Sequence, residues 1–163
     1  MVRRLHSGGS RRAEGLFDVR HGRGLARWLA RALRMPRAGE GIRTVLTVTS
    51  EAYGERWDRR FGADGFVTEQ RPGEDGRLHE GFGRLELRLD LWVAGGALRF
   101  EPAGAAFRVG RHAVPVPRWI APRVGGRVSA EGERVRVEVE VRAPLLGLVI
   151  GYSGSVGPAE AFP

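Results

Sequence analysis

Apolar and polar residues alternate along most of the chain from residue 42 onwards, which is the pattern of β-strands that bury one face. In the clearest run, 85–93, four leucines and a valine occupy the odd positions, between polar side chains and one tryptophan. A second run, 134–142, alternates valines with arginines and glutamates. Shorter runs lie at 42–49, 66–70, 98–100, 106–109 and 145–155. We expect about seven or eight short strands in all, at hairpin spacing and without a βαβ unit.

Glycines punctuate these strands. The glycine pair at 95–96 fits a two-residue hairpin turn. The segment 78–82 has its apolar residues at even positions, whereas 85–93 has them at odd positions. We expect a bulge or bend near Gly81 or Gly83 to absorb this change of phase.

Residues 25–35 have the helical period instead. Their apolar positions form one stripe, made of Leu25, Trp28, Leu29, Ala32 and Leu33. The opposite face carries Arg27, Arg31 and Arg34, and Pro36 ends the helix. We expect the stripe to pack on the sheet of the same domain, with the arginines in water. The alternative is a helix that lies on an anionic membrane.

These elements predict an α+β fold, in which a strongly curved antiparallel sheet carries one N-terminal amphipathic helix. The sheet either curls into a barrel or half-barrel around its own interior, or is covered by the helix, and both can hold together. We expect one domain over 14–156, preceded by a flexible basic arm (1–13) and followed by a tail (157–163).

Composition narrows the function classes. The 163 residues are 42% hydrophobic and 28% charged, which is typical of a globular domain. There is no cysteine, which excludes disulfides, zinc–thiolate sites and thiol catalysis. No apolar run approaches the roughly 18 residues of a spanning helix, and no secretory signal follows the basic N-terminus. We therefore expect a cytoplasmic protein.

The net charge of +8 is a weaker clue than it first suggests. It is carried by arginine alone, because the chain has no lysine, and together with 25 glycines this is typical of genes rich in G and C. Most of the arginines alternate with carboxylates along the predicted strands, so we do not expect specific nucleic-acid recognition. A weak contact with a membrane surface stays open.

Motifs for catalysis or metal binding are few. The four histidines are scattered, with no two at the spacing of metal ligands. Residues 151–155 resemble a nucleophile elbow, but Ser155 stands where glycine is required and no helix follows. There is no P-loop and no dinucleotide-binding fingerprint. We predict no catalytic residues, no metal site and no cofactor, and keep an enzyme as the third hypothesis.

The segment 55–61 has the most informative pattern. As a strand it has one wholly polar face, so its other face points inward. The inward residues are Glu55, Trp57, Arg59 and Phe61. A buried arginine needs a partner or a bound anion, because an unpaired buried charge is costly. Glu55 can supply that partner, and so can Glu80, which has the inward phase of its own strand.

Two interpretations of this face follow. In the first, it anchors the polar group of a ligand inside an apolar cavity, and the candidate ligand-binding residues are Trp57, Arg59, Phe61, Glu80, Arg118 and Trp119. In the second, the arginine and glutamate form a structural pair that closes the barrel. A filled interior with a direct Arg59–Glu80 pair would favour the second.

The order and spacing of several short motifs resemble the bacterial domain-of-unknown-function family 4166. The matching stretches are 55–62, 78–83, 95–98, 116–122, 143–147 and 152–154, and the resemblance covers about residues 14–156. It implies no activity. Members of that family also occur fused behind a saccharopine-dehydrogenase-like domain, which implies at most a helper role beside an oxidoreductase.

The leading functional hypothesis is therefore non-enzymatic binding of an apolar or amphiphilic small molecule in the concave interior. The alternative is a protein-interaction module that docks a partner, such as an oxidoreductase-like domain, through its sheet or the Trp28 helix. Native mass spectrometry of the purified protein distinguishes the two: a co-purifying small molecule supports the first hypothesis, and a stoichiometric protein partner supports the second.

Overall fold

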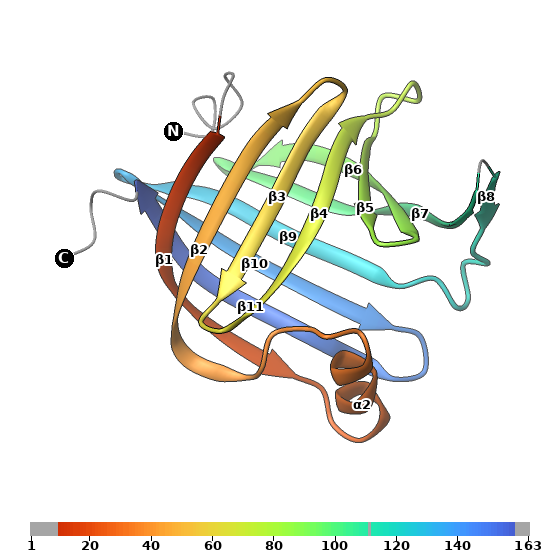
Figure 1. The fold of residues 1–163 in the computed structure, drawn as a ribbon, viewed down its shortest axis with the longest axis horizontal. Coiled ribbons are helices and arrows are strands. Elements are labelled where there is room, and N and C mark those ends of the chain that lie inside the picture. The colour runs from red at the N-terminus through yellow and green to blue at the C-terminus, as the bar shows by residue number, and fades with distance from the viewer. Residues whose placement is uncertain (1–9, 111, 159–163) are drawn as a thin grey trace.

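One continuous antiparallel sheet and a short helix make up residues 10–110 and 112–158, the part of the chain that the computed structural model describes (Figure 1). The helix is α2 (Leu25–Ala32) and the strands are β1 (Ser10–His21), β2 (Gly39–Glu51), β3 (Gly54–Phe61), β4 (Asp64–Pro72), β5 (Leu78–Phe82), β6 (Leu85–Ala94), β7 (Ala97–Val109), β8 (His112–Pro115), β9 (Arg123–Glu131), β10 (Arg134–Ala143) and β11 (Gly147–Pro158).

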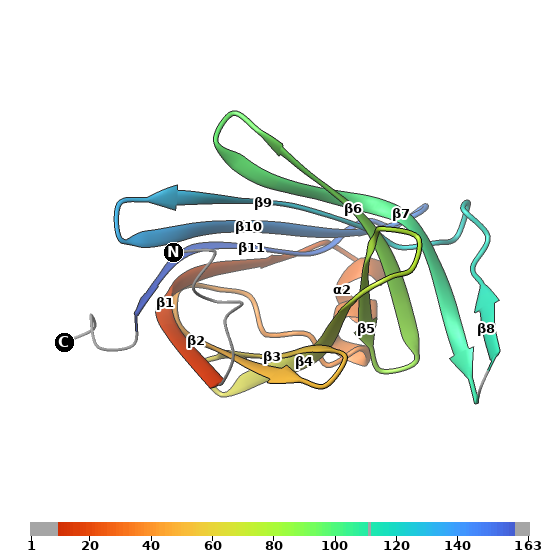
Figure 2. The same cartoon turned by 90° about the horizontal axis from the view of Figure 1, so that it is seen from above.

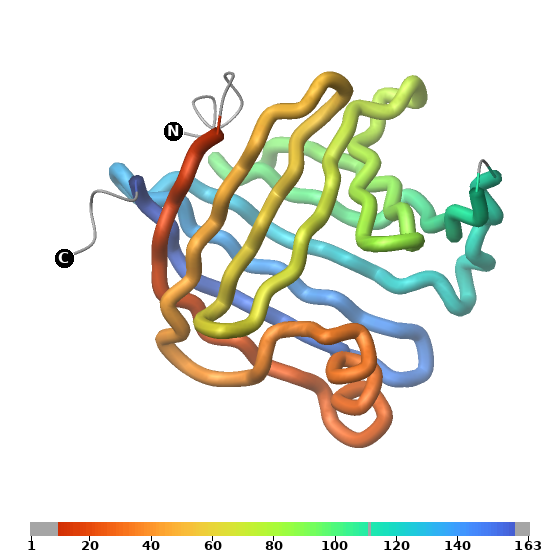
Figure 3. Tube along the Cα trace, viewed as in Figure 1, coloured from red at the N-terminus to blue at the C-terminus, as the bar shows by residue number. Residues whose placement is uncertain are grey.

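Pairing between β6 and β7 closes ten of these strands into a barrel. The order around the wall is β6-β5-β4-β3-β2-β1-β11-β10-β9-β7, and β8 extends the sheet outside the ring. Along one edge, β7 pairs with two strands in turn: its first four residues pair with β9 and its last four with β8. The trace in Figure 3 follows this meander, and Figure 2 shows β9–β11 facing β2–β4 across the interior.

The predicted curved antiparallel sheet is confirmed, in its closed form, but the predicted number of strands is wrong: the described residues form eleven. The sequence pattern missed β1 entirely. Phe17 and Val19 are buried in the core, but Leu16 is exposed and Gly15 has no side chain, so the alternation is broken. Ser10 begins this strand, so the last residues of the predicted arm belong to the barrel, and residues 1–9 lie outside the described part. Likewise β11 ends at Pro158, and the rest of the predicted tail lies outside it.

The change of phase between β5 and β6 is absorbed by a bend at Gly83, one of the two predicted positions, rather than by a bulge. The two strands form a tight hairpin in which Phe82 pairs with Leu85. Gly83 turns the chain with a φ of +58°, a conformation that glycine adopts without steric cost. The glycine pair at 95–96 makes the predicted hairpin, with both residues at positive φ.

The face of the helix that packs on the barrel overlaps the predicted apolar stripe only in part, since Leu29 and Leu33 of that stripe line the barrel interior. Ala26 and Ala30 are its buried residues, whereas Leu25 and Trp28 of the predicted stripe are 70% and 67% exposed. The face with the small side chains of Ala26 and Ala30 is buried because the chain comes very close to β11 here. A Cβ on Gly22 would lie only 1.8 Å from the Leu148 carbonyl oxygen. No helix within the described residues is long and apolar enough to cross a membrane.

The barrel has two ends, which we name by what forms them. The helix end consists of α2, the turns at 61–64, 82–85 and 143–147, and the segment between β7 and β9 (Figure 1). The turn end consists of the turns at 51–54, 72–78, 94–97 and 131–134. Aromatic side chains of the core, among them Phe17, Phe61 and Tyr152, pack against one another across the interior.

Candidate functional site

The barrel encloses a cavity of about 1290 Å³, which runs from the helix end to the turn end. Sites for drug-sized molecules usually measure about 300–1000 Å³, so this cavity is larger than a usual ligand site. Most of its lining is apolar, and β6, β9 and β10 contribute Leu85, Leu87, Leu89, Val124, Val128, Val137, Val139 and Val141. The polar groups are concentrated on the facing strands.

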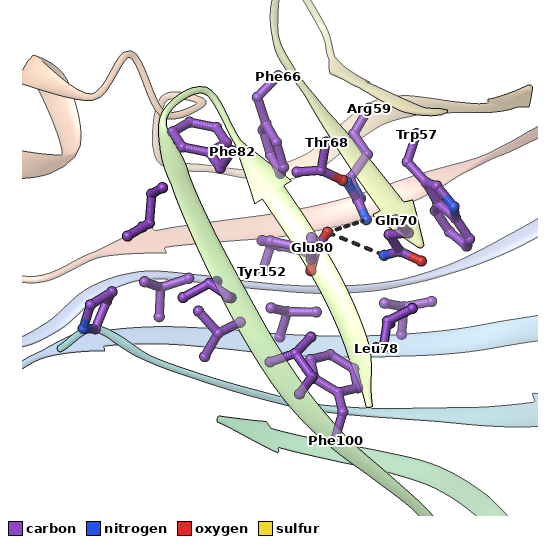
Figure 4. Close-up of a pocket in the computed structure, with 18 of the residues that line it drawn as sticks. Trp57, Arg59, Phe66, Thr68, Gln70, Leu78, Glu80, Phe82, Phe100 and Tyr152 are labelled. Carbon is purple, nitrogen blue, oxygen red and sulfur yellow. Dashed lines mark hydrogen bonds and ion pairs between the residues drawn. The ribbon is translucent and has the colours of Figure 1, made fainter. Parts of the chain in front are cut away.

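Three neighbouring strands supply those polar groups by the same alternation. β3 directs Trp57 and Arg59 inward, and β4 directs Thr68 and Gln70 inward. Register brings these residues together, because Trp57 lies opposite Thr68, and Gln70 opposite Glu80 of β5. Figure 4 shows the resulting cluster.

An ion pair is the centre of this cluster. Arg59 Nη2 lies 3.3 Å from Glu80 Oε1, and each side chain is only 13% exposed. Arg59 Nη1 also donates to Thr68 Oγ1 at 2.6 Å. The Glu80 carboxylate accepts a further hydrogen bond, 3.2 Å long, from Gln70 Nε2. The pair is thus direct, and its charges are compensated within the barrel.

Two aromatic rings flank the guanidinium of Arg59. Its central carbon lies 5.2 Å from the ring centre of Trp57 and 5.3 Å from that of Phe66, within the range of cation–π attraction. The Trp57 indole N–H donates to Glu55 Oε2 at 3.0 Å. These contacts hold the cation in one orientation against an otherwise apolar wall.

Tyr152 of β11 approaches the ion pair from the opposite side of the barrel. Its ring packs against Phe61, with ring centres 5.3 Å apart. Burial raises the pKa of the Tyr152 phenol above its usual value; the nearby Arg59 charge lowers it and the Glu80 charge raises it again, with burial the larger effect. The phenol is therefore a neutral hydrogen-bonding group at physiological pH.

Four of the six predicted ligand-binding residues line the cavity: Trp57, Arg59, Phe61 and Glu80. Arg118 and Trp119 do not line it. They lie in a turn between β8 and β9, in which the N–H groups of Ile120 and Ala121 donate to the Pro117 carbonyl. Trp119 is 72% exposed as a result.

The sequence reasoning missed three polar members of the site. Thr68 and Gln70 share the inward phase of Phe66 in β4, and this alternation is the signal that could have found them. Tyr152 has a weaker signal, because glycines at 151 and 154 interrupt the apolar alternation of β11.

A second cluster lies on the outer face of the same wall, around Glu86. Its carboxylate accepts from Arg71 at 2.7 Å and from Arg108 at 2.9 Å. Burial acts to raise the pKa of Glu86, but the two arginines outweigh it and hold the pKa below the usual value. His79 Nδ1 lies 3.2 Å from the same carboxylate, and its Nε2 contacts Asp75. Metal-binding groups of three or more side chains do not occur among the described residues.

The fold is thus that of a closed antiparallel barrel, with an apolar cavity and one polar cluster on the inner wall. The chain belongs to the family described as "Domain of unknown function (DUF4166)", whose model matches residues 1–156. This confirms the resemblance seen in the sequence. No curated protein and no solved structure matches the chain.

Proposed function

We propose that this chain binds an apolar or amphiphilic small molecule inside the barrel without transforming it. The observation that carries the proposal is the cavity of about 1290 Å³ with the Arg59–Glu80 pair on its wall. Protein interiors are normally packed to crystal density, and a large apolar void forfeits packing energy. A bound molecule would restore those contacts.

The competing interpretation is a purely structural pair that closes the barrel. The direct Arg59–Glu80 contact agrees with it. The unfilled interior does not, because a pair that served only to join strands would need no space in front of it. The partner groups of the pair also face the cavity, where a ligand can reach them (Figure 4).

Charge favours a neutral polar group on the ligand. Arg59 and Glu80 compensate each other, so a ligand carboxylate would meet the Glu80 charge at close range in a poorly solvated site. A hydroxyl or carbonyl carries no such penalty. It can accept from the guanidinium or exchange a hydrogen bond with the Tyr152 phenol.

Binding explains the titratable groups better than catalysis does. The Glu80 carboxylate is already engaged by Arg59 and Gln70, and His79 belongs to the outer cluster rather than to the cavity. We therefore assign Arg59, Glu80 and Tyr152 to holding a ligand's polar group.

Displacement of a fluorescent probe tests the proposal. N-phenyl-1-naphthylamine, which is neutral and fluoresces in apolar surroundings, should bind the wild-type chain and be displaced by hexadecan-1-ol. Val137→Trp places an indole ring in the cavity from β10 and should weaken probe binding, whereas Glu138→Trp, on the outer face of the same strand, should not. Absence of probe binding to the wild type, or equal binding to both variants, would overturn the proposal.

A further inference from the structure

Large apolar side chains project into solvent at the helix end. Leu25 and Trp28 of α2 are about two-thirds exposed, Trp119 is 72% exposed and Leu145 is 99% exposed. Leu145 also adopts a φ of +65°, which is rare for a residue other than glycine. An exposed leucine in that conformation serves neither the core nor the turn, so its role lies outside the folded chain.

These side chains lie at the same end of the barrel (Figures 1 and 2). Gly22, which lies three residues before α2, is tied to β11 because its N–H donates to the Val149 carbonyl. The turn that carries Leu145 joins β11 to β10, and Arg142 at the end of β10 pairs with Arg123 at the start of β9. Figures 1 and 2 show α2, this turn and the segment that precedes β9 on the same side of the barrel.

Arginine accompanies the apolar residues. Six exposed arginines lie at this end. Four belong to α2 or its flanks (Arg23, Arg27, Arg31 and Arg34), and two lie in or beside the segment before β9 (Arg118 and Arg123). The acidic residue in the described parts of this end is Asp64, whose carboxylate is held by Arg37 at 3.1 Å. The helix end is therefore strongly cationic.

The turn end has the opposite charge. Its described turns carry five carboxylates (Glu51, Glu74, Asp75, Glu131 and Glu133) against two arginines (Arg77 and Arg134), so its net charge is negative. A barrel whose charge reflected only a gene rich in G and C would show no such division. The molecule is thus polarised along its axis, with apolar tips and arginines together at one end.

We propose that the helix end docks on the surface of an anionic lipid bilayer. Arginines complement the lipid phosphates and anionic headgroups, while Trp28 and the leucine tips enter the boundary between headgroups and acyl chains. Separate apolar tips on several turns suit a flat, deformable surface. A folded protein partner would instead match a continuous, pre-shaped patch.

The same surface adjoins the mouth of the cavity. Leu33 and Ile120 line the cavity and are still 43% and 46% exposed, so they stand at its opening. A chain docked by this end would hold that opening against the bilayer, which is a source of apolar and amphiphilic molecules. The docking itself does not depend on what the cavity holds, so each can fail without the other.

Vesicle flotation tests the proposal with the full chain. It should float with vesicles of phosphatidylcholine mixed with phosphatidylglycerol, and remain unbound with phosphatidylcholine alone or at high salt. Because each arginine near such a surface contributes about a fivefold gain in binding, Arg27→Glu with Arg31→Glu should abolish flotation. Leu25→Ser with Trp28→Ser should abolish it as well.

Matched controls lie elsewhere on the barrel. Arg99→Glu with Arg127→Glu makes the same change in net charge on the exposed wall, and Tyr53→Ser with Val93→Ser removes exposed apolar groups at the turn end. Both should leave flotation unchanged. Brominated phosphatidylcholine in the anionic vesicles should quench tryptophan fluorescence, and Trp28→Phe with Trp119→Phe should remove that quenching.

Three results would overturn the proposal. The wild-type chain could fail to float with anionic vesicles, or the wall and helix-end variants could lose binding equally, which would mean non-specific attraction by net charge. Alternatively, the wild-type chain could fail to bind vesicles and instead self-associate in analytical ultracentrifugation or form a stoichiometric complex with a protein. Loss of that association in the helix-end variants would assign this surface to a protein.

Discussion

Two ion-pair clusters on the same wall of the barrel differ in how well they are satisfied. Outside, Glu86 is held by Arg71 and Arg108, with His79 beside it. Inside, Glu80 has one arginine, at 3.3 Å, and an amide. Both carboxylates are nearly buried, but the outer one is paired with two arginines, whereas the inner one is paired with one and faces the cavity. The outer cluster completes the fold by itself, whereas the inner one leaves room for a ligand's polar group.

Removing one arginine from each cluster should give the largest difference. Arg59→Met leaves Glu80 without its counter-charge beside the cavity, and should lower the free energy of unfolding by about 3 kcal/mol. Arg108→Met leaves Arg71 on Glu86, and should cost about 1 kcal/mol or less. Thermal unfolding followed by circular dichroism measures both. Equal losses would contradict the distinction between the clusters.

Removing the inner pair altogether should separate stability from binding. Arg59→Met combined with Glu80→Met replaces the charges by apolar groups, which is often neutral for stability, so unfolding should return to within about 1 kcal/mol of the wild type. Displacement of N-phenyl-1-naphthylamine by hexadecan-1-ol should still weaken about tenfold, the loss of one or two hydrogen bonds. Unchanged displacement by the alcohol would show that the pair is structural only.

Acid should act on the outer cluster. Because the pKa of Glu86 in the folded state lies below the 4.5 of a free glutamate side chain, its stabilising contribution is complete above about pH 4.5 and is lost as the pH falls through the lower folded value. The midpoint of thermal unfolding should therefore drop on acidification below pH 4.5. Glu86→Gln should make that drop shallower, and a curve as steep as that of the wild type would count against the assigned pairing.

The smallest effect is expected at Tyr152. Tyr152→Phe keeps the ring contacts with Phe61 and Phe66 and removes only the hydroxyl, so stability should change by less than about 1 kcal/mol. Displacement by hexadecan-1-ol should weaken about threefold, and displacement by hexadecane should not change. An equal change for both competitors would show that the hydroxyl does not contact the ligand's polar group.

Alternation carried the sequence predictions wherever a strand runs uninterrupted. It placed Trp57, Arg59 and Glu80 on inward faces without knowledge of the partner strands, and the structure brings them together. It gives no information where the chain is irregular: Arg118 and Trp119 lie in a turn, whose side-chain directions follow no period, and they do not line the cavity.

Other features depend on contacts that no local pattern contains. The closing pairing of β6 with β7 and the insertion of β1 between β2 and β11 are long-range choices of register. The apolar stripe of α2 was visible in the sequence, but not its partner. Which face of α2 is buried depends on the close approach of Gly22 and Ala26 to β11, and this left Trp28 in solvent.

The most direct test of the account is native mass spectrometry of the chain after incubation with hexadecan-1-ol. The account predicts one alcohol molecule on each wild-type chain and on Glu138→Trp, and a lower occupancy on Val137→Trp, whose indole ring reduces the space in the cavity. An adduct of equal abundance on all three proteins, or none on the wild type, would contradict the claim that the barrel interior is a binding site.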